Sequence, residues 1–208
     1  GEVSVALHAV EDAREYGTAV IKDGTIETFE EKAAKPKSNL ANCSLYVFEP
    51  SIFKKIREVK KSTRGEYEII DLLKGATAVQ ISDYWLDMGM PWQIFSANEF
   101  LLSKLPDNRD RVENTTIRGK IIMEKDAEVH DSVIEGSVYI GEGSYVGPHA
   151  YIRGTTSIGK DCGIGDSTTI KNSIIFDHVN AKHLTYIGDS IIGSGCNFGA
   201  ATQIANYR

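Results

Sequence analysis

Residues 134–170 read IEGSVYIGEGSYVGPHAYIRGTTSIGKDCGIGDSTTI, and a β-branched aliphatic residue stands at every sixth position of this stretch. Glycine directly follows four of these positions, where a small residue lets the chain turn a corner. The pattern predicts a parallel β-helix in which three hexapeptides form one coil, so that residues about 18 apart stack about 4.8 Å from one another. An antiparallel sandwich would need polar alternation and a hairpin turn roughly every 8 to 12 residues. The aliphatic positions are Ile134, Ile140, Val146, Ile152, Ile158, Ile164 and Ile170.

The six-residue register is interrupted after Ile170. The segment 176–184 departs from it, and the pattern resumes at Ile187. An interruption in a solenoid predicts a loop that leaves the stack, and such loops often carry function.

Glycine is distributed unevenly along the chain. Six of the 19 glycines lie in residues 1–115 and 13 lie in residues 116–208. A shift of this kind indicates two architectures in one chain. We expect an α/β domain over residues 1–110 and a β-helix over residues 111–208.

The first half alternates strand and helix patterns, which is typical of an α/β layer domain. Asp23-Gly24 supplies the positive φ angles of a tight hairpin turn. No GxGxxG or GxxxxGK[ST] loop occurs in the sequence. The expected strands cover residues 3–10, 18–21, 25–29, 44–48, 78–81 and 84–86, and the expected helices cover 51–61, 66–74 and 91–105.

Composition narrows the functional classes. Hydrophobic residues make up 41% of the chain and the net charge is -6, which is ordinary for a globular protein and argues against nucleic-acid binding. No apolar run is long enough to span a membrane. Three scattered cysteines without a CxxC pair, and an N-terminus without a signal peptide, favour the reducing cytoplasm. The histidines lack the spacing of a zinc site.

Two sets of motifs resemble one enzyme family. Residues 182–207, KHLTYIGDSIIGSGCNFGAATQIANY, resemble the acetyltransferase signature of bifunctional UDP-N-acetylglucosamine pyrophosphorylase/glucosamine-1-phosphate N-acetyltransferases. The first half resembles sugar-1-phosphate nucleotidylyltransferases through Glu15-Tyr-Gly17, Phe29-Glu-Glu-Lys32, Arg64 to Asp71 and Trp85 to Pro91. The resemblance to the archaeal-type fusion implies the C-terminal portion of a Rossmann-like nucleotidyltransferase domain followed by an incomplete left-handed β-helix, the chain being truncated at both ends.

For acetyl transfer, the resemblance implies that His183 is the general base that takes a proton from the amine of glucosamine-1-phosphate as it attacks acetyl-CoA. An imidazole with an ordinary pKa near 6.5 suits that task. Arg153 and Lys171 match the phosphate-binding cations, and their spacing gives independent support because they lie one coil apart. Each cation follows a core aliphatic residue, in the position where glycine usually stands. The resemblance further implies amino-sugar contacts at Tyr186, Asn197, Asn206 and Tyr207 and an acetyl-CoA contact at Gly199 and Ala200, although Ala201 replaces a usual glycine.

For nucleotidyl transfer, the resemblance implies that Asp87 holds Mg²⁺ with a second aspartate from an earlier strand. It also implies a sugar-phosphate pocket formed by Gly17, Glu31, Lys32 and Asn42. Taken singly, each of these residues has an ordinary surface explanation. The family's glycine-rich nucleotide loop and pyrophosphate-stabilising lysine do not occur in the sequence, so we expect these 208 residues alone to form no UDP-sugar or dTDP-sugar.

Three functional hypotheses follow. The first is a bifunctional cytoplasmic enzyme that uses acetyl-CoA, a sugar-1-phosphate and UTP or dTTP, and that forms a homotrimer through the β-helix. The second is a nucleotidylyltransferase, such as a thymidylyltransferase, whose β-helix is structural or regulatory. The third is a non-catalytic regulatory subunit. A purely structural β-helix has no need of His183, Arg153 and Lys171 together, which favours the first. Sugar stereochemistry and nucleotide base preference stay open.

Overall fold

The computed structural model describes residues 2–62 and 65–206, and the chain divides into two compact units, Gly1–Asp87 and Met88–Arg208. Within the described ranges, no helix is long and apolar enough to cross a membrane. Each unit has its own buried core.

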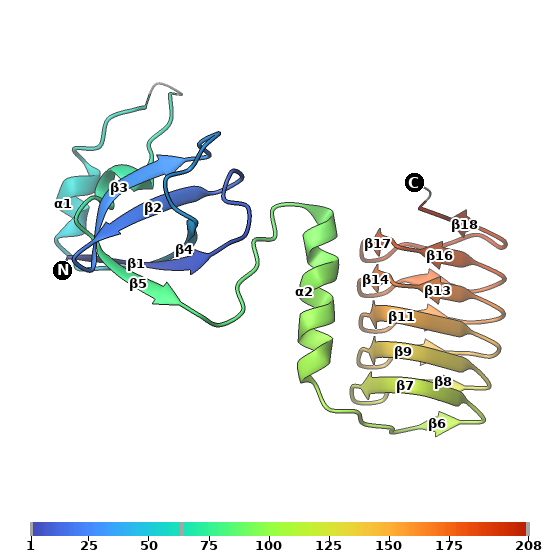
Figure 1. Ribbon diagram of the computed structural model, residues 1–208. Helices are drawn as coiled ribbons and strands as arrows, with labels where there is room; N and C mark the ends of the chain where they lie inside the picture. Colours follow the sequence, from blue (N-terminus) through green and yellow to red (C-terminus); the bar gives the residue numbers. More distant parts are fainter. Residues whose placement is uncertain (1, 63–64, 207–208) are drawn as a thin grey trace. The chain divides into compact units, whose positions relative to one another are not determined.

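The first unit is a closed barrel of strands in the order β1-β4-β2-β3-β5 (Figure 1). β2 and β3 form the predicted hairpin, with Asp23 at φ 49° and Gly24 at φ 76° in its turn. Leu7 and Ile26 are among the fully buried side chains of the core. The strand bounds are β1 Val3–Ala9, β2 Gly17–Lys22, β3 Thr25–Glu31, β4 Leu40–Phe48 and β5 Thr77–Ile81.

Two of the expected helices in this unit are much shorter than predicted. The helix expected over residues 51–61 is reduced to α1, Ile52–Ile56, because only Ile52 of its apolar face is buried. A helix without a buried face gains little from tertiary packing. The helix expected over 66–74 is a single 3₁₀ turn, η1, Ile69–Leu72, preceded by Glu68 in an extended conformation. The strand expected over 84–86 is absent, and Trp85 instead packs its ring against His8 and Tyr16.

The second unit contains the predicted parallel β-helix. Its strands pair in parallel register, and Ile134, Ile152, Ile170 and Ile187 stack in successive coils, each of them fully buried. The strand bounds are β6 Val112–Glu113, β7 Thr116–Met123, β8 Glu128–His130, β9 Val133–Ile140, β10 Tyr145–Val146, β11 Tyr151–Ile158, β12 Gly163–Ile164, β13 Thr169–Lys171, β14 Ile174–Ile175, β15 Asn180–Ala181, β16 Tyr186–Gly188, β17 Ile191–Ile192 and β18 Gln203–Ile204. All seven aliphatic positions that predicted the fold are buried.

The expected loop over residues 176–184 does not leave the stack, so that prediction is wrong. The chain continues into β15, which pairs with β12, and Ile175 pairs with Ile158. The change of register comes earlier, because Ile175 follows Ile170 by five residues instead of six. The later coils are therefore one residue shorter at this corner, and the β-helix itself is uninterrupted.

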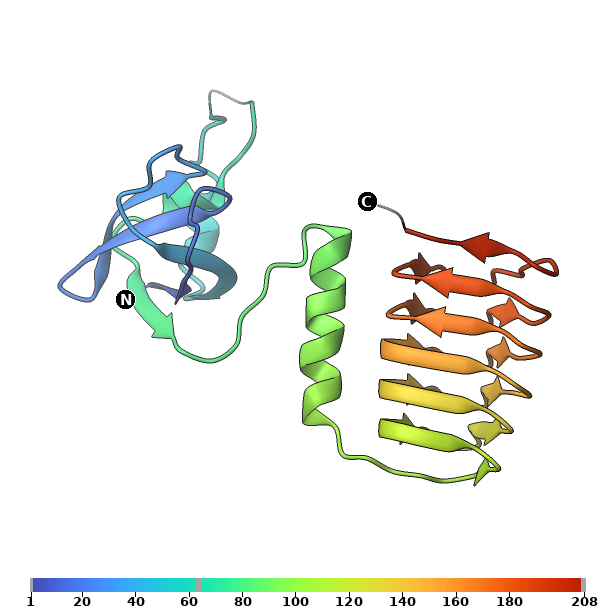
Figure 2. The same cartoon turned by 45° about the vertical axis from the view of Figure 1, so that its right-hand side comes forward.

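Helix α2, Pro91–Lys104, lies along the β-helix and contacts β9 and β11 (Figures 1 and 2). The Asn98 side chain is hydrogen-bonded to β11, where it accepts from Ser157 Oγ at 2.5 Å. Lys120 Nζ on β7 donates to the carbonyl oxygen of Leu105 at 2.8 Å. These contacts place α2 in the second compact unit, whereas the sequence analysis put the domain boundary at residues 110 and 111.

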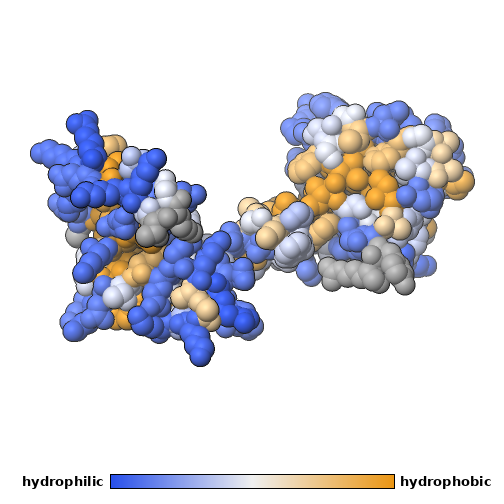
Figure 3. Space-filling model, turned by 90° about the horizontal axis from the view of Figure 1, so that it is seen from above, coloured by the Kyte–Doolittle hydropathy of each residue, from blue (hydrophilic) through white to orange (hydrophobic). Residues whose placement is uncertain are grey.

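The core of the β-helix is best covered in its middle coils. Val112 and Ile117 in the first coils, and Phe198 and Ile204 in the last ones, are only partly buried against it. Seen from above in Figure 3, apolar colour accordingly gathers on the last coil, inside a more hydrophilic rim.

Candidate functional sites on the two units

The five residues predicted for the nucleotidyltransferase site line one cavity of about 280 Å³ in the first unit. They come from the ends of β2 and β3, from β4 and from the segment after β5. The rest of the lining consists of their chain neighbours Glu15, Tyr16, Cys43, Ser44, Trp85 and Leu86. The predicted residues are Gly17, Glu31, Lys32, Asn42 and Asp87.

Gly17 is required by the position of Glu31. The two residues are partners across β2 and β3, and a Cβ atom at Gly17 would lie 2.6 Å from Glu31 Oε2 and 2.7 Å from a ring carbon of Phe29. A side chain there would displace the carboxylate. Lys32 follows at φ 45° and donates its backbone N–H to the Tyr16 carbonyl oxygen at 3.1 Å.

Hydrogen bonds and aromatic packing order the other side of the cavity. Asn42 Nδ2 donates to the Tyr46 hydroxyl at 2.6 Å, and Asn42 Oδ1 accepts from the Ser44 N–H at 3.1 Å. Burial, with the charges of Asp87 and other nearby carboxylates, raises the pKa of Tyr16. The Tyr16 hydroxyl is therefore a neutral donor at physiological pH.

Asp87 can supply one metal ligand. Within residues 2–62 and 65–206, no group of three His, Cys, Asp or Glu side chains is arranged to hold a metal ion. Mg²⁺ is usually bound by one or two carboxylates, with its other ligands coming from water and substrate phosphates. Asp87 fits that mode of binding, in which the nucleotide brings most of the ligands.

The second site lies on one outer face of the β-helix. The side-chain column next to the buried isoleucines reads Arg118, Glu135, Arg153, Lys171 and Gly188, each paired in register with the next. The prediction that Arg153 and Lys171 replace corner glycines is wrong, because this face carries charged residues in four successive coils. The two cations are adjacent in the column, which places their backbones about 4.8 Å apart on neighbouring strands.

Arg153 has an unsatisfied donor. Its Nε atom is buried and has no hydrogen-bond partner, which is rare for a polar atom. The guanidinium carbon lies 5.5 Å from the centroid of the Tyr151 ring. An anion at this place would satisfy the charge and the free N–H together.

Lys171 is held by residues that the sequence analysis missed. Its Nζ lies 2.9 Å from Asp189 Oδ2, and Asn172 Nδ2 donates to Asp189 Oδ1 at 2.9 Å. The hydrogen bond from Lys171 lowers the pKa of Asp189. Asn172 and Asp189 occupy the corner position that Gly154 fills one coil earlier, at φ 44° and 49°, and Asn and Asp tolerate this conformation. Asp189 follows Asn172 by 17 residues and Lys171 by 18, which is about one coil, and this spacing was the signal that the sequence offered.

His183 lies at the other edge of the same face, in the turn before β16, and its side chain is exposed. Its Nδ1 is 3.3 Å from Asp166 Oδ2, one coil below. Among the described residues, Nε2 has no hydrogen-bond partner. Between His183 and the cations, the Tyr186 hydroxyl lies over Gly188, where a Cβ atom would come within 2.7 Å of it. Asp166 was also missed, again at a 17-residue spacing.

The remaining predicted residues lie around this face but do not all meet. Asn206 Nδ2 donates to the Asp189 carbonyl oxygen at 3.4 Å, so it adjoins the cations. Gly199 and Ala200 lead to Ala201, whose N–H donates to the His183 carbonyl oxygen at 2.9 Å. Asn197 stacks on Asn180 on a neighbouring face. Tyr207 lies outside the described residues.

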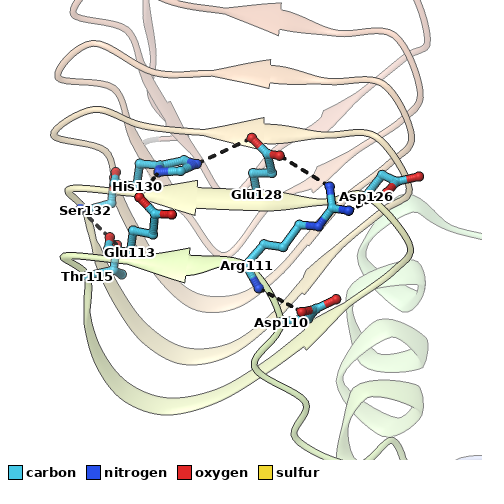
Figure 4. Close-up of polar contacts among 8 residues, drawn as sticks. All are labelled: Asp110, Arg111, Glu113, Thr115, Asp126, Glu128, His130 and Ser132. Atoms are coloured by element: carbon cyan, nitrogen blue, oxygen red, sulfur yellow. Dashed lines mark hydrogen bonds and ion pairs between the residues drawn. The ribbon is translucent and has the colours of Figure 1, made fainter.

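A separate polar network covers the first coils on another face (Figure 4). Arg111 pairs with Asp126 at 2.9 Å and with Glu128 at 3.4 Å, and the His130 ring lies 3.4 Å from both Glu128 and Glu113. These groups satisfy one another between successive coils. The network therefore has the character of structural pairing, in contrast to the adjacent cations.

Comparison with known proteins gives matches over both units. The model of the nucleotidyl transferase family matches residues 1–104, and the model of the GMPPB C-terminal domain matches residues 134–207. The bifunctional protein GlmU of Methanocaldococcus jannaschii is 40% identical over 99% of this chain and 53% of its own length. The bifunctional protein GlmU of Methanococcus aeolicus is 37% identical over 98% of this chain and 52% of its own.

A third relative carries a more descriptive name. The bifunctional sugar-1-phosphate nucleotidylyltransferase/acetyltransferase of Sulfurisphaera tokodaii is 37% identical over 96% of this chain and 52% of its own length. The chain thus spans about half the length of the curated relatives it matches.

Proposed function

The chain belongs to the nucleotidyl transferase family. Because it is also similar, over about half of their length, to bifunctional sugar-1-phosphate nucleotidylyltransferases/acetyltransferases, we propose that the protein serves nucleotide-sugar synthesis through two activities. The β-helix transfers an acetyl group from acetyl-CoA to glucosamine-1-phosphate. The α/β domain transfers a nucleotidyl group from a nucleoside triphosphate to a sugar-1-phosphate and releases pyrophosphate.

One observation carries the acetyltransferase proposal. Arg153 and Lys171 are stacked in adjacent coils, and Arg153 keeps a buried N–H without a partner. Like charges placed directly opposite one another destabilise a sheet, so this arrangement favours a bound anion. The substrate phosphate would occupy that place, and the sugar would extend along β16 toward His183. Three strand residues span about 10 Å, a distance that a hexose phosphate and two side chains can bridge.

His183 is the proposed general base. Its Nδ1 faces Asp166, and this contact favours the tautomer in which Nδ1 carries the proton and Nε2 accepts one. The Nε2 atom takes a proton from the substrate amine as the amine nitrogen bonds to the acetyl carbonyl carbon. The carbon–sulfur bond of acetyl-CoA then breaks, and the proton leaves with the thiolate as free coenzyme A. Tyr186, Asn197, Asn206 and Tyr207 would orient the sugar, and Gly199 and Ala200 would adjoin the thioester.

In the α/β domain, the cavity around Glu31 supports sugar-1-phosphate binding. Glu31 would accept hydrogen bonds from sugar hydroxyls, Lys32 would meet the phosphate, and Gly17 and Asn42 would line the ring. Asp87 would hold Mg²⁺, which neutralises charge on the phosphates when bound. The domain boundary is proposed at residues 110 and 111. The family match over 1–104, which includes α2, supports this boundary, although α2 packs on the β-helix. Assembly into a trimer through the β-helix is part of the same proposal.

The test measures thiol release from acetyl-CoA by the complete natural protein, with glucosamine-1-phosphate as acceptor. We expect His183→Ala to lower kcat on the order of 100-fold or more, as loss of a general base does. His178→Ala is the matched control, because His178 is also exposed and also faces an aspartate one coil below, with its Nδ1 3.7 Å from Asp161. Equal rates for the two variants would rule out His183 as the base.

A second assay separates the proposal from the alternative of a purely structural β-helix. Galactosamine-1-phosphate and glucose-1-phosphate are tested beside glucosamine-1-phosphate. Glucose-1-phosphate has no amine and should release no thiol. If no amino sugar phosphate supports thiol release while nucleotide-sugar formation proceeds, the β-helix is structural or regulatory.

A further inference from the structure

Glu135 is the nearest acidic neighbour of Arg153 in the charge column, yet the two side chains form no ion pair. Their residues are direct register partners on β9 and β11. Glu135 Oε1 accepts from Arg118 Nη1 at 2.6 Å, and Glu135 Oε2 accepts from the Tyr151 hydroxyl. Both carboxylate oxygens are therefore engaged by groups other than Arg153.

Tyr151 contacts both members of this pair of opposite charges. Its hydroxyl binds Glu135, while its ring lies beside the guanidinium of Arg153, 5.5 Å from centroid to carbon. The hydrogen bonds from Tyr151 and Arg118 lower the pKa of Glu135, so the carboxylate is ionised at neutral pH. A free carboxylate one strand away would be a strong competitor for the guanidinium.

We propose that Tyr151 and Arg118 are positioning residues that hold Glu135 away from Arg153 and so leave the guanidinium available for the substrate phosphate. This inference rests on the proposed acetyltransferase site. It explains why an arginine with a carboxylate neighbour keeps a buried N–H without a partner. It also gives Tyr151 and Glu135 a role in substrate affinity that is separate from the chemical step.

The test is Tyr151→Phe in the complete natural protein. The substitution keeps the ring beside Arg153 and removes only the hydroxyl, which frees Glu135 Oε2. We expect the calorimetric Kd for glucosamine-1-phosphate, and the KM in the thiol-release assay, to rise about tenfold, the scale of one charged hydrogen bond. The kcat should stay within about twofold, because His183 is untouched. Arg118→Gln, which frees Oε1, should give the same signature and serves if Tyr151→Phe does not fold.

Removing the competing charge should restore binding. In Tyr151→Phe/Glu135→Gln, residue 135 carries no charge that could compete for Arg153, and we expect the Kd to return to within about twofold of the wild type. A tyrosine with a purely structural role would show no such rescue. Tyr139→Phe is the matched control, because the Tyr139 hydroxyl also binds a glutamate, Glu124, and should leave the Kd unchanged.

Arg153→Ala separates the inference from the function on which it rests. If Arg153→Ala leaves the Kd for glucosamine-1-phosphate unchanged, the proposed phosphate site is wrong. If Arg153→Ala weakens binding while Tyr151→Phe and Arg118→Gln do not, the site stands and the positioning role is overturned. Weakening by Tyr151→Phe without rescue by Glu135→Gln also contradicts it.

Discussion

Asp189→Asn should tighten the binding of glucosamine-1-phosphate while it destabilises the fold. Asp189 binds Lys171 and Asn172 at 2.9 Å each, so it neutralises one of the two cations of the proposed site. A phosphate between Arg153 and Lys171 would lie beside this carboxylate. Asparagine keeps the shape and the corner conformation but carries no charge.

The size of the effect follows from Coulomb's law. The Asp189 carboxylate and the bound phosphate are treated as two negative charges about 6 Å apart. At an effective dielectric constant of about 40, they repel one another by about 1.4 kcal/mol. Loss of the partner that orders Lys171 costs about 0.5 kcal/mol in return. The net gain of about 0.9 kcal/mol corresponds to a Kd about fivefold lower.

The effect on stability has the opposite sign and depends on pH. The pKa of Asp189 is lowered in the folded protein, chiefly by Lys171. Its contribution is therefore fully present above the unfolded-state pKa of about 3.9 and is lost as the pH falls through the lower folded value. For this partly exposed pair we expect Asp189→Asn to lower the free energy of unfolding by about 1 kcal/mol at pH 7 and by less at pH 3.

Isothermal calorimetry with glucosamine-1-phosphate and urea unfolding at both pH values measure these two effects. Asp177→Asn is the control for net charge, since Asp177 accepts a backbone hydrogen bond from Lys160 N at 2.8 Å in a different turn. A Kd that rises in Asp189→Asn would refute the electrostatic reasoning, because it would mean that ordering Lys171 outweighs the repulsion of the phosphate.

Four other substitutions test the backbone and the first unit. Ala201→Gly should raise the free energy of unfolding by about 0.5 to 1 kcal/mol in urea denaturation, because Ala201 has φ 61° and glycine adopts that conformation freely. Gly136→Ala should lower the free energy of unfolding by about 3 kcal/mol or more, since its Cβ would lie 2.4 Å from the carbonyl oxygen of Gly154. Gly195→Ala is the control in the same assay. Its residue has φ 73° and open space around it, so the substitution should cost only about 1 kcal/mol. In the complete natural protein, Gly17→Ala should raise the KM for sugar-1-phosphate in nucleotide-sugar formation at least tenfold, because the new Cβ would lie 2.6 Å from Glu31 Oε2 and displace that carboxylate. An unchanged KM would remove Glu31 from the sugar pocket.

The β-helix could be predicted from sequence because its core repeats. Each inward position has the same neighbours one coil above and below, so the requirement for a β-branched aliphatic residue recurs with the coil. Ile134, Ile152 and Ile170 meet that requirement and stack in register. The spacing of Arg153 and Lys171 was readable for the same reason.

The contacts that complete the site could not be predicted, because they depend on how many residues each coil contains. The chain shortens by one residue between Ile170 and Ile175, and this shift brings Asp189 opposite Asn172 and His183 opposite Asp166. A strict 18-residue spacing relates Lys171 to Asp189, as observed, but it would place Leu184 instead of His183 one coil from Asp166. The prediction of a long helix over residues 51–61 was wrong for a different reason. Amphipathic spacing does not reveal whether another part of the protein covers the apolar face of the helix.

The charge pattern of the β-helix separates structural from functional residues. Across its coils, opposite charges usually meet, as Arg118 meets Glu135 and Arg111 meets Glu128. Among the paired strand residues of the described ranges, Arg153 and Lys171 are the pair in which two cations adjoin. Asp189 balances Lys171 in the free protein, and a bound anion would offset the repulsion that remains between the two cations. The residual repulsion, together with the engagement of both oxygens of Glu135 by Arg118 and Tyr151, is what the proposed phosphate site would use.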